Sequence, residues 1–358
     1  MNNRVLFQIC DIFNDAEIDL EYYDLEKLLG EIILNRTAGI AYNNLDFINK
    51  RVPIEFKNAL KVIFLNNIEK AKRYKNNIRN LSLLFYECDF DYAFLKGSFL
   101  STVLYKEGLR TSNDIDILLN SEDISSCQQL LIRNGFIQGY YSQEKGIVPA
   151  TRREIIQSRM NYGETVPFLK MVDDDLLVID INFSVDFKPS SNRPIVKELI
   201  QSSIDIDFED IKIRTLNPVD FIIHLCCHLY KEATTYNWLI SKRDLLLYKF
   251  CDINLMLHHY GNRVYFKELL ARIKHFHIGK ECYYTFENSS IIYPKLRGIE
   301  GFEEFMEQVR PSDLNYMKQI LFPMEKKLYE YSMGFEEWFF CEDRISNLKE
   351  IPYEENGV

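Results

Sequence analysis

Two short apolar runs, separated by a helix-length segment, constrain the fold of this chain more than any other feature of its sequence. The first run, residues 89–95, leads into Lys96-Gly97-Ser98, the pattern of a strand that enters a turn. The second run, residues 115–119, is apolar except for one aspartate and predicts a largely buried strand. A helix is expected between them, over about residues 99–108. This order of strand, turn, helix and strand predicts a sheet in the middle of the chain.

The segments on either side of this unit are predicted to be mainly helical. Between residues 15 and 85 the apolar residues recur at helical spacing, which indicates three or four helices. Beyond Pro218 the pattern is helical almost to the end of the chain. Because 358 residues are enough for two or three domains, we expect an α+β protein with three regions: 1–85, helical; 86–215, with the sheet; and 216–358, helical.

Further segments complete the central region. Residues 124–133 are predicted to form a helix with Ser121 as its N-cap and Gly135 at its end. A strand is expected at residues 176–183, and residues 205–216 read as an irregular strand and loop.

Charge and hydropathy exclude some classes of partner. Acidic residues outnumber basic ones by 53 to 43, and the net charge of -10 disfavours the binding of long nucleic acid, which is driven by counterion release. No apolar run approaches the ~20 residues that span a bilayer, so no membrane partner is expected. The eight cysteines include no Cys-x-x-Cys pair, and we expect reduced thiols in a cytoplasmic protein.

Two carboxylates lie close together at the second predicted strand. Asp114 and Asp116 are two residues apart, so in a strand their side chains leave the same face, with Cα atoms roughly 7 Å apart. Such a pair repels itself unless a cation neutralises it, and Mg²⁺ prefers a partial oxygen shell that phosphate and water complete. The pair therefore predicts a metal site.

A third acid, Asp180, lies in the later apolar strand, where a lone carboxylate would be costly without a partner. It could bind the same metal site or act as general base. If the register of this strand is different, Asp175 or Asp186 takes its place.

The turn before the helix has the residues of a phosphate site. Gly97 lets phosphate approach the backbone, and Ser98 can donate a hydroxyl and a backbone N–H near the N-terminus of the following helix. Lys96 and Arg110 are candidate cations for the phosphates, and the Arg110 guanidinium can bind them in bidentate fashion.

These motifs resemble the signature of the nucleotidyltransferase superfamily of the DNA polymerase β type. They are most similar to the uncharacterised bacterial nucleotidyltransferases that have a Lys-Gly turn and an Arg-x-x-x-Asp-Ile-Asp strand. The residues that carry the resemblance are Leu95-Lys96-Gly97-Ser98, Leu104-Tyr105, Arg110 and Asp114-Ile115-Asp116-Ile117-Leu118.

The resemblance implies a fold, a cofactor and a donor. The fold is a small mixed β-sheet core flanked by helices, the cofactor is Mg²⁺ or Mn²⁺ in its place, and the donor is ATP or another NTP. Gly97 and Ser98 match the phosphate-binding turn, Asp114 and Asp116 the metal pair, and Asp180 the third acid. Asn182 stands where some relatives have a histidine two residues after the third acid.

Other polar residues have weaker signals. His224 and His228 are four residues apart, as in some zinc sites, but no glutamate follows His224 as a metalloprotease requires. His228 and Lys231 could instead approach the nucleotide or acceptor. The basic residues of one predicted helix could guide an anionic acceptor or simply face solvent: Lys70, Lys72, Arg73, Lys75 and Arg79.

The sequence therefore predicts a nucleotidyltransferase that moves an NMP from an NTP to a hydroxyl or phosphate acceptor and releases pyrophosphate. The acceptor could be a small molecule, a peptide or a tRNA end. The alternative is an inactive protein of the same fold that binds a nucleotide or a partner.

Overall fold

In a computed structural model, the chain is described over residues 4–20, 23–48, 52–86, 88–172, 175–185 and 195–353. It forms two compact units: one combines Met1–Lys61 with Ile222–Val358, and the other is Val62–Phe221. Two helices cross the boundaries between them, α4 (Ile54–Phe85) and α9 (Pro218–Ala233). The boundaries expected from the sequence lay near residues 85 and 216.

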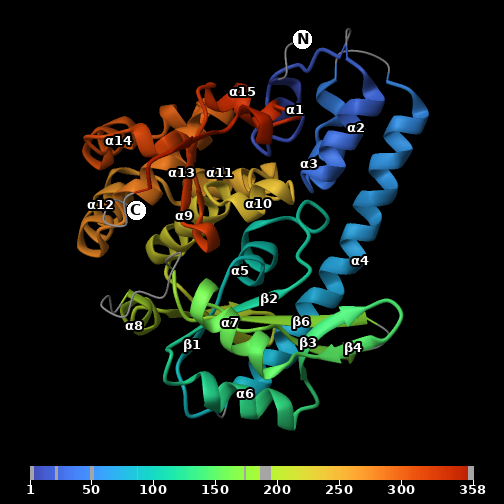
Figure 1. The fold of residues 1–358 in the computed structure, drawn as a ribbon. Coiled ribbons are helices and arrows are strands. Elements are labelled where there is room, and N and C mark those ends of the chain that lie inside the picture. The colour runs from blue at the N-terminus through green and yellow to red at the C-terminus, as the bar shows by residue number, and fades with distance from the viewer. Residues whose placement is uncertain are drawn as a thin grey trace. The chain divides into compact units, whose positions relative to one another are not determined.

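The unit Val62–Phe221 is built on a mixed sheet with the strand order β4-β3-β5-β6-β2-β1-β8-β7 (Figure 1). The pairs β2–β6 and β1–β8 are parallel, and the other pairs are antiparallel. The bounds are β1 (Tyr92–Phe94), β2 (Ile115–Leu119), β3 (Ile137–Ser142), β4 (Gly146–Pro149), β5 (Phe168–Val172), β6 (Asp175–Asn182), β7 (Ile204–Phe208) and β8 (Ile211–Thr215). The expected α+β class with a mixed sheet is confirmed, and the sheet is larger than expected.

One face of this sheet packs on the hydrophobic core. The C-terminal half of α4 and the helix α6 supply Ile78, Phe85, Cys127 and Leu131 to the core. The other helices of the unit are α5 (Gly97–Phe99), the π-helical turn η2 (Leu100–Leu104), α7 (Arg152–Tyr162) and α8 (Ile195–Gln201), with α6 at Ile124–Arg133.

Alternation along the central strands decides which side chains face this core. Residues 115, 117 and 119 of β2 and residues 177, 179 and 181 of β6 belong to the core cluster. Because successive side chains of a strand point to opposite faces, residues 116 and 180 lie on the opposite face of the sheet. The apolar core therefore places two aspartates on one surface.

The unit formed by Met1–Lys61 and Ile222–Val358 is mainly helical and also contains a sheet with the order β11-β10-β9. Its elements are α1 (Arg4–Ile9), α2 (Leu25–Leu34), α3 (Ala38–Asn43), η1 (Leu45–Phe47), α10 (Tyr236–Ile240), α11 (Leu247–Tyr260), α12 (Arg263–Phe276), α13 (Gly279–Ile292), η3 (Pro294–Gly298), α14 (Phe302–Val309), η4 (Asn315–Lys318), β9 (Gln319–Phe322), η5 (Pro323–Glu325), β10 (Lys327–Glu330), α15 (Phe335–Phe340), η6 (Ile345–Asn347) and β11 (Lys349–Ile351). Aromatic packing is prominent in this unit: the rings of Tyr331 and Trp338 stack with centroids 4.0 Å apart.

Several local predictions need correction. Residues 204–215 form the regular hairpin β7–β8, and the nearly all-helical region beyond Pro218 contains three short strands. The helix expected over residues 99–108 ends at Leu104, and five of its residues are π-helical. The N-cap of α6 is Asp123, which makes no side-chain capping bond, whereas Ser121 lies in the turn before it.

Within the described residues, no helix is long and apolar enough to cross a membrane. All eight cysteines lie in this part of the chain, and none forms a disulfide.

Candidate active site

The turn after β1 has a strained backbone at its first residue. Lys96 has φ 44° and ψ −117°, a conformation that residues other than glycine rarely adopt. The turn is closed by two backbone hydrogen bonds of 3.0 Å, from Ser98 N to Leu95 O and from Leu100 N to Lys96 O. Such outliers persist only where the surrounding structure enforces them, and they are concentrated at functional sites.

Gly97 is required by its neighbours. A Cβ atom at this position would collide with Ser112 Oγ and would lie 2.7 Å from Ser112 Cβ and 2.9 Å from Arg110 Nη1. The glycine therefore lets the turn pack against the segment that leads into β2. From the sequence, Gly97 was expected so that phosphate could approach the backbone. The packing of the turn against Ser112 and Arg110 is a second reason for a glycine at this position.

Arg110 lies behind the turn. It is 8% exposed, and its Nη1 donates to Ser112 Oγ and, at 3.2 Å, to Ser101 Oγ. Its guanidinium thus connects the π-helical turn to the loop before β2. The expected bidentate contact with phosphates stays a prediction.

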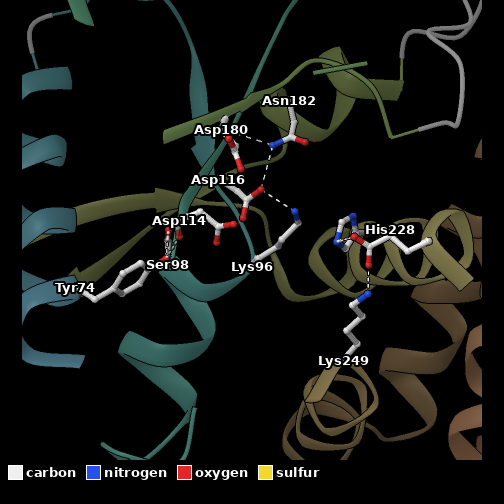
Figure 2. Close-up of polar contacts among 10 residues, drawn as sticks. Tyr74, Lys96, Ser98, Asp114, Asp116, Asp180, Asn182, His228 and Lys249 are labelled. Atoms are coloured by element: carbon white, nitrogen blue, oxygen red, sulfur yellow. Dashed lines mark hydrogen bonds and ion pairs between the residues drawn. The ribbon is translucent and has the colours of Figure 1, made fainter. Parts of the chain in front are cut away.

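Ser98 is fully buried beside a tyrosine that the sequence analysis missed. The hydroxyl of Tyr74 in α4 lies 3.3 Å from Ser98 Oγ and donates to the backbone oxygen of Asp114 at 2.9 Å (Figure 2). Burial raises the pKa of the Tyr74 hydroxyl well above its usual value, so it stays protonated. Its helical spacing with Ile78 and Leu81 marks it as buried, but no local signal shows that it contacts the turn.

The aspartates lie side by side on parallel strands. Asp116 of β2 is the register partner of Asp180 in β6, and Asp114 comes directly before β2. Figure 2 shows the three side chains near one another, with Asn182 beyond Asp180. The residues Asp114, Asp116 and Asp180 are called the aspartate cluster below.

The pKa of Asp180 is strongly shifted in the aspartate cluster. Burial raises the pKa of its carboxyl well above the usual range, and the negative charges of Asp116 and then Asp114 add to this effect, whereas Lys96 acts in the opposite direction. Burial and the two neighbouring carboxylates therefore both favour the protonated form of the Asp180 carboxyl.

Asp116 has two side-chain donors. Lys96 Nζ lies 2.7 Å from its Oδ1, and Asn182 Nδ2 lies 3.3 Å from the same oxygen (Figure 2). Asp116 is only 3% exposed, so these donors replace the water that a buried carboxylate lacks. Asn182 was noted in the sequence only for its position after the third acid.

The donor set has the chemistry that Mg²⁺ requires, because three carboxylates on neighbouring strands supply hard oxygen ligands. In the described residues, however, no three His, Cys, Asp or Glu side chains are gathered so that they could hold a metal ion. The strand register places the aspartates at neighbouring positions, as a metal site needs. The Asp116 carboxylate, however, is hydrogen-bonded to the Lys96 ammonium group.

The comparisons with known proteins bear on this geometry. Residues 23–294 match the model of a family described as uncharacterised nucleotidyltransferase. The chain belongs to this family. The match spans well over half of the chain and includes the turn, the aspartate cluster and Tyr74.

A solved structure described as an antigenic nucleotidyltransferase-like protein from Paracoccidioides brasiliensis resembles this family member. The two are 14% identical, with a TM-score of 0.38, and the alignment covers 67% of this chain and 93% of the other. At this TM-score the likeness supports no conclusion about the site. None of the curated proteins matches the sequence.

The alternative third acids have other positions in this family member. Asp175 is at the beginning of β6 and forms an ion pair with Arg73 of α4. Asp186 lies outside the described residues. Asp180 is therefore the acid of β6 that joins Asp114 and Asp116.

The histidines of α9 belong to the other unit. The rings of His224 and His228 are nearly parallel, with centroids 6.2 Å apart, and His228 Nε2 lies 3.4 Å from Glu232 Oε1. Glu232 also accepts a hydrogen bond from Lys249 Nζ, and the side chains of Glu232 and Lys249 are each 7% exposed. No three potential ligands are gathered for a metal ion in the described part of the chain, which agrees with the missing glutamate after His224. An approach of His228 and Lys231 to a nucleotide stays a prediction.

The basic residues of α4 are largely balanced by acids of the same unit. Their ion pairs are Lys72–Glu69, Arg73–Asp175, Lys75–Glu107 and Arg79–Asp210. Because these pairs are mostly exposed, each contributes little to stability. They give this helix face a mixed charge, which does not favour a binding stripe for an anionic acceptor.

Proposed function

We propose that the chain transfers a nucleoside monophosphate from an NTP, most simply ATP, to a hydroxyl or phosphate acceptor and releases pyrophosphate. Membership of a nucleotidyltransferase family supports the general reaction. The observation that carries the assignment to a site is the parallel register of Asp116 with Asp180, next to Asp114 and the glycine turn. The more specific likeness to the DNA polymerase β type is part of this proposal.

In the proposed reaction, Asp114, Asp116 and Asp180 would hold Mg²⁺ or Mn²⁺. When bound, such an ion supplies positive charge to the phosphates and lowers the pKa of an attacking hydroxyl. Lys96 and Gly97 would position the phosphates at the turn. Arg110, Ser112 and Tyr74 hold this turn and the start of β2 in place through the hydrogen bonds described above.

The direct test is incubation of the protein with α-labelled NTPs, Mg²⁺ and a cell extract, followed by identification of whatever becomes labelled. The variants are Asp116→Asn, which removes a carboxylate of the site, and Asp175→Asn, a matched control at the beginning of the neighbouring strand β6. We expect label transfer with the wild type and the control, and at least a ~100-fold loss with Asp116→Asn. Unchanged transfer in a folded Asp116→Asn variant would refute the site.

A second candidate is a binding protein without turnover. The ion pair of Lys96 with Asp116 favours it, because an internal cation already neutralises a proposed metal ligand. Calorimetric titration with Mg²⁺-NTP, paired with a pyrophosphate assay over a broad panel of acceptors, separates the two. Tight binding without any pyrophosphate release would support the binder.

A further inference from the structure

The Lys96 ammonium group occupies the place where a metal ion would meet Asp116. Its Nζ is 2.7 Å from Asp116 Oδ1, the oxygen that also accepts from Asn182. An ion bound to this oxygen would lie next to the positive charge of Lys96, and the two cations would repel each other. The structure therefore describes the site in its lysine-bound form.

The backbone of Lys96 is fixed, whereas its side chain can move. The hydrogen bond from Leu100 N to Lys96 O helps to hold the main chain within the turn despite the strained φ and ψ of Lys96. The side chain is a flexible four-carbon stem with a compact charge and three rotatable donors. It is 19% exposed, so the ammonium group can leave Asp116 without passing through the core.

The turn offers the released ammonium group a second partner. Lys96 directly precedes Gly97, where the phosphates of the nucleotide are proposed to bind. A lysine can bind carboxylate or phosphate as a point charge. A phosphate at the turn would therefore give the Lys96 ammonium group a new negatively charged partner in place of Asp116. A metal ion at the aspartate cluster would in the same way give the Asp116 carboxylate a new positively charged partner in place of Lys96.

We propose that Lys96 is the internal counter-ion of the aspartate cluster and moves from Asp116 to the nucleotide phosphates when metal and nucleotide bind, so that the two ligands bind cooperatively. This inference rests on the proposed function. It assigns Lys96 a positioning and coupling role: metal alone binds weakly because it must displace the lysine, and nucleotide strengthens metal binding because it takes up the displaced charge.

The test measures Mn²⁺ binding by electron paramagnetic resonance, with and without an NTP analogue whose α–β phosphate bridge cannot be cleaved. The variants are Lys96→Met, which has an unbranched side chain of similar length without the charge, and Lys96→Arg, which keeps the charge. Lys75→Met is the matched control, because Lys75 Nζ is also 2.7 Å from a carboxylate, that of Glu107, and its side chain is similarly exposed at 20%.

We expect Lys96→Met to bind Mn²⁺ alone about tenfold more tightly than the wild type. The gain in Mn²⁺ affinity that the analogue produces in the wild type should largely disappear in Lys96→Met. Lys96→Arg and Lys75→Met should keep the wild-type behaviour. A purely structural ion pair would leave the gain in Mn²⁺ affinity that the analogue produces unchanged in Lys96→Met.

Equal Mn²⁺ affinity of Lys96→Met and the wild type, with the same effect of the analogue, overturns the role of Lys96 and leaves the proposed function intact. Absence of Mn²⁺ binding to every variant, with and without the analogue, overturns the proposed metal site and the role of Lys96 together. Circular dichroism of each variant verifies that it is folded, and Lys96→Gln replaces Lys96→Met if the latter is not.

Discussion

Asp116 and Asp180 are register partners on the parallel strands β2 and β6, on the face of the sheet opposite the apolar core. The side chains that alternate with them are fully buried, so a shift of either strand by one residue would expose the core. The same apolar pattern that builds the sheet therefore fixes the two carboxylates side by side. Stability and the proposed chemistry depend on one register.

We expect Gly97→Ala to destabilise the protein by about 1–3 kcal/mol, because the new Cβ collides with Ser112. Urea unfolding followed by circular dichroism measures the loss. Ser112→Gly removes the colliding atoms, so the double variant should recover part of the stability. Gly30→Ala is the control: nothing lies within 4 Å of its Cβ, and alanine in helix α2 should stabilise by roughly 0.5–1 kcal/mol. Additive effects of Gly97→Ala and Ser112→Gly would contradict the steric explanation.

Lys96→Gly should be more stable than Lys96→Ala by about 1 kcal/mol, because only glycine adopts φ 44° and ψ −117° without strain. Both variants lack the ammonium group, so their difference isolates the backbone. At Lys75, inside the helix α4, the order should be reversed, with alanine better by about 1 kcal/mol. The measurement is the midpoint of urea unfolding for the four variants. If alanine were more stable than glycine at position 96 as well as at position 75, the backbone of Lys96 would not be strained.

The sequence predicted those parts of the site that depend on local pattern. The bounds of β2 and α6 agree with the expected ranges, because a compact apolar run and a helical repeat are complete signals within a few residues. Three acids and the glycine turn were recognised by residue type and spacing. Their side-by-side placement follows once β2 and β6 are parallel neighbours.

Other parts of the fold could not be predicted in this way. Strand β7 is mostly exposed and Glu209-Asp210 interrupts the segment, although β8 is half-buried, so residues 205–216 were interpreted as an irregular strand and loop. The contacts of Ser112 with Gly97 and of Tyr74 with Ser98 join segments that are distant in sequence. The contact of Lys96 with Asp116 is visible only in the tertiary structure. The sequence indicated Lys96 as a partner of phosphate and gave no sign of this ion pair.

Removal of Lys249 should cost about 3–5 kcal/mol, because it leaves the buried carboxylate of Glu232 without its ammonium partner. The double variant Lys249→Met/Glu232→Gln should lose less stability than Lys249→Met alone. The exposed pair Lys27–Glu342 is the control, and Lys27→Met should cost at most about 1 kcal/mol. Urea unfolding of these three variants and of Glu232→Gln provides the four values. A double variant as unstable as the sum of its single changes would argue against coupling of the pair.

The stability of the protein should decrease as the pH falls below about 6.5, in part through His258. Burial and the positive charge of Lys295 lower the pKa of His258 below its ordinary value of 6.5. The unfolded chain therefore binds a proton at a pH where the folded protein does not, and stability is lost as the pH falls from 6.5 towards the lowered pKa. His258→Gln should flatten this part of the pH profile. His259→Gln, at the exposed neighbouring position of α11, should leave it unchanged. Thermal unfolding at several pH values between 5 and 8 checks both variants, and an equally steep profile for His258→Gln and the wild type would exclude this histidine as a source of the effect.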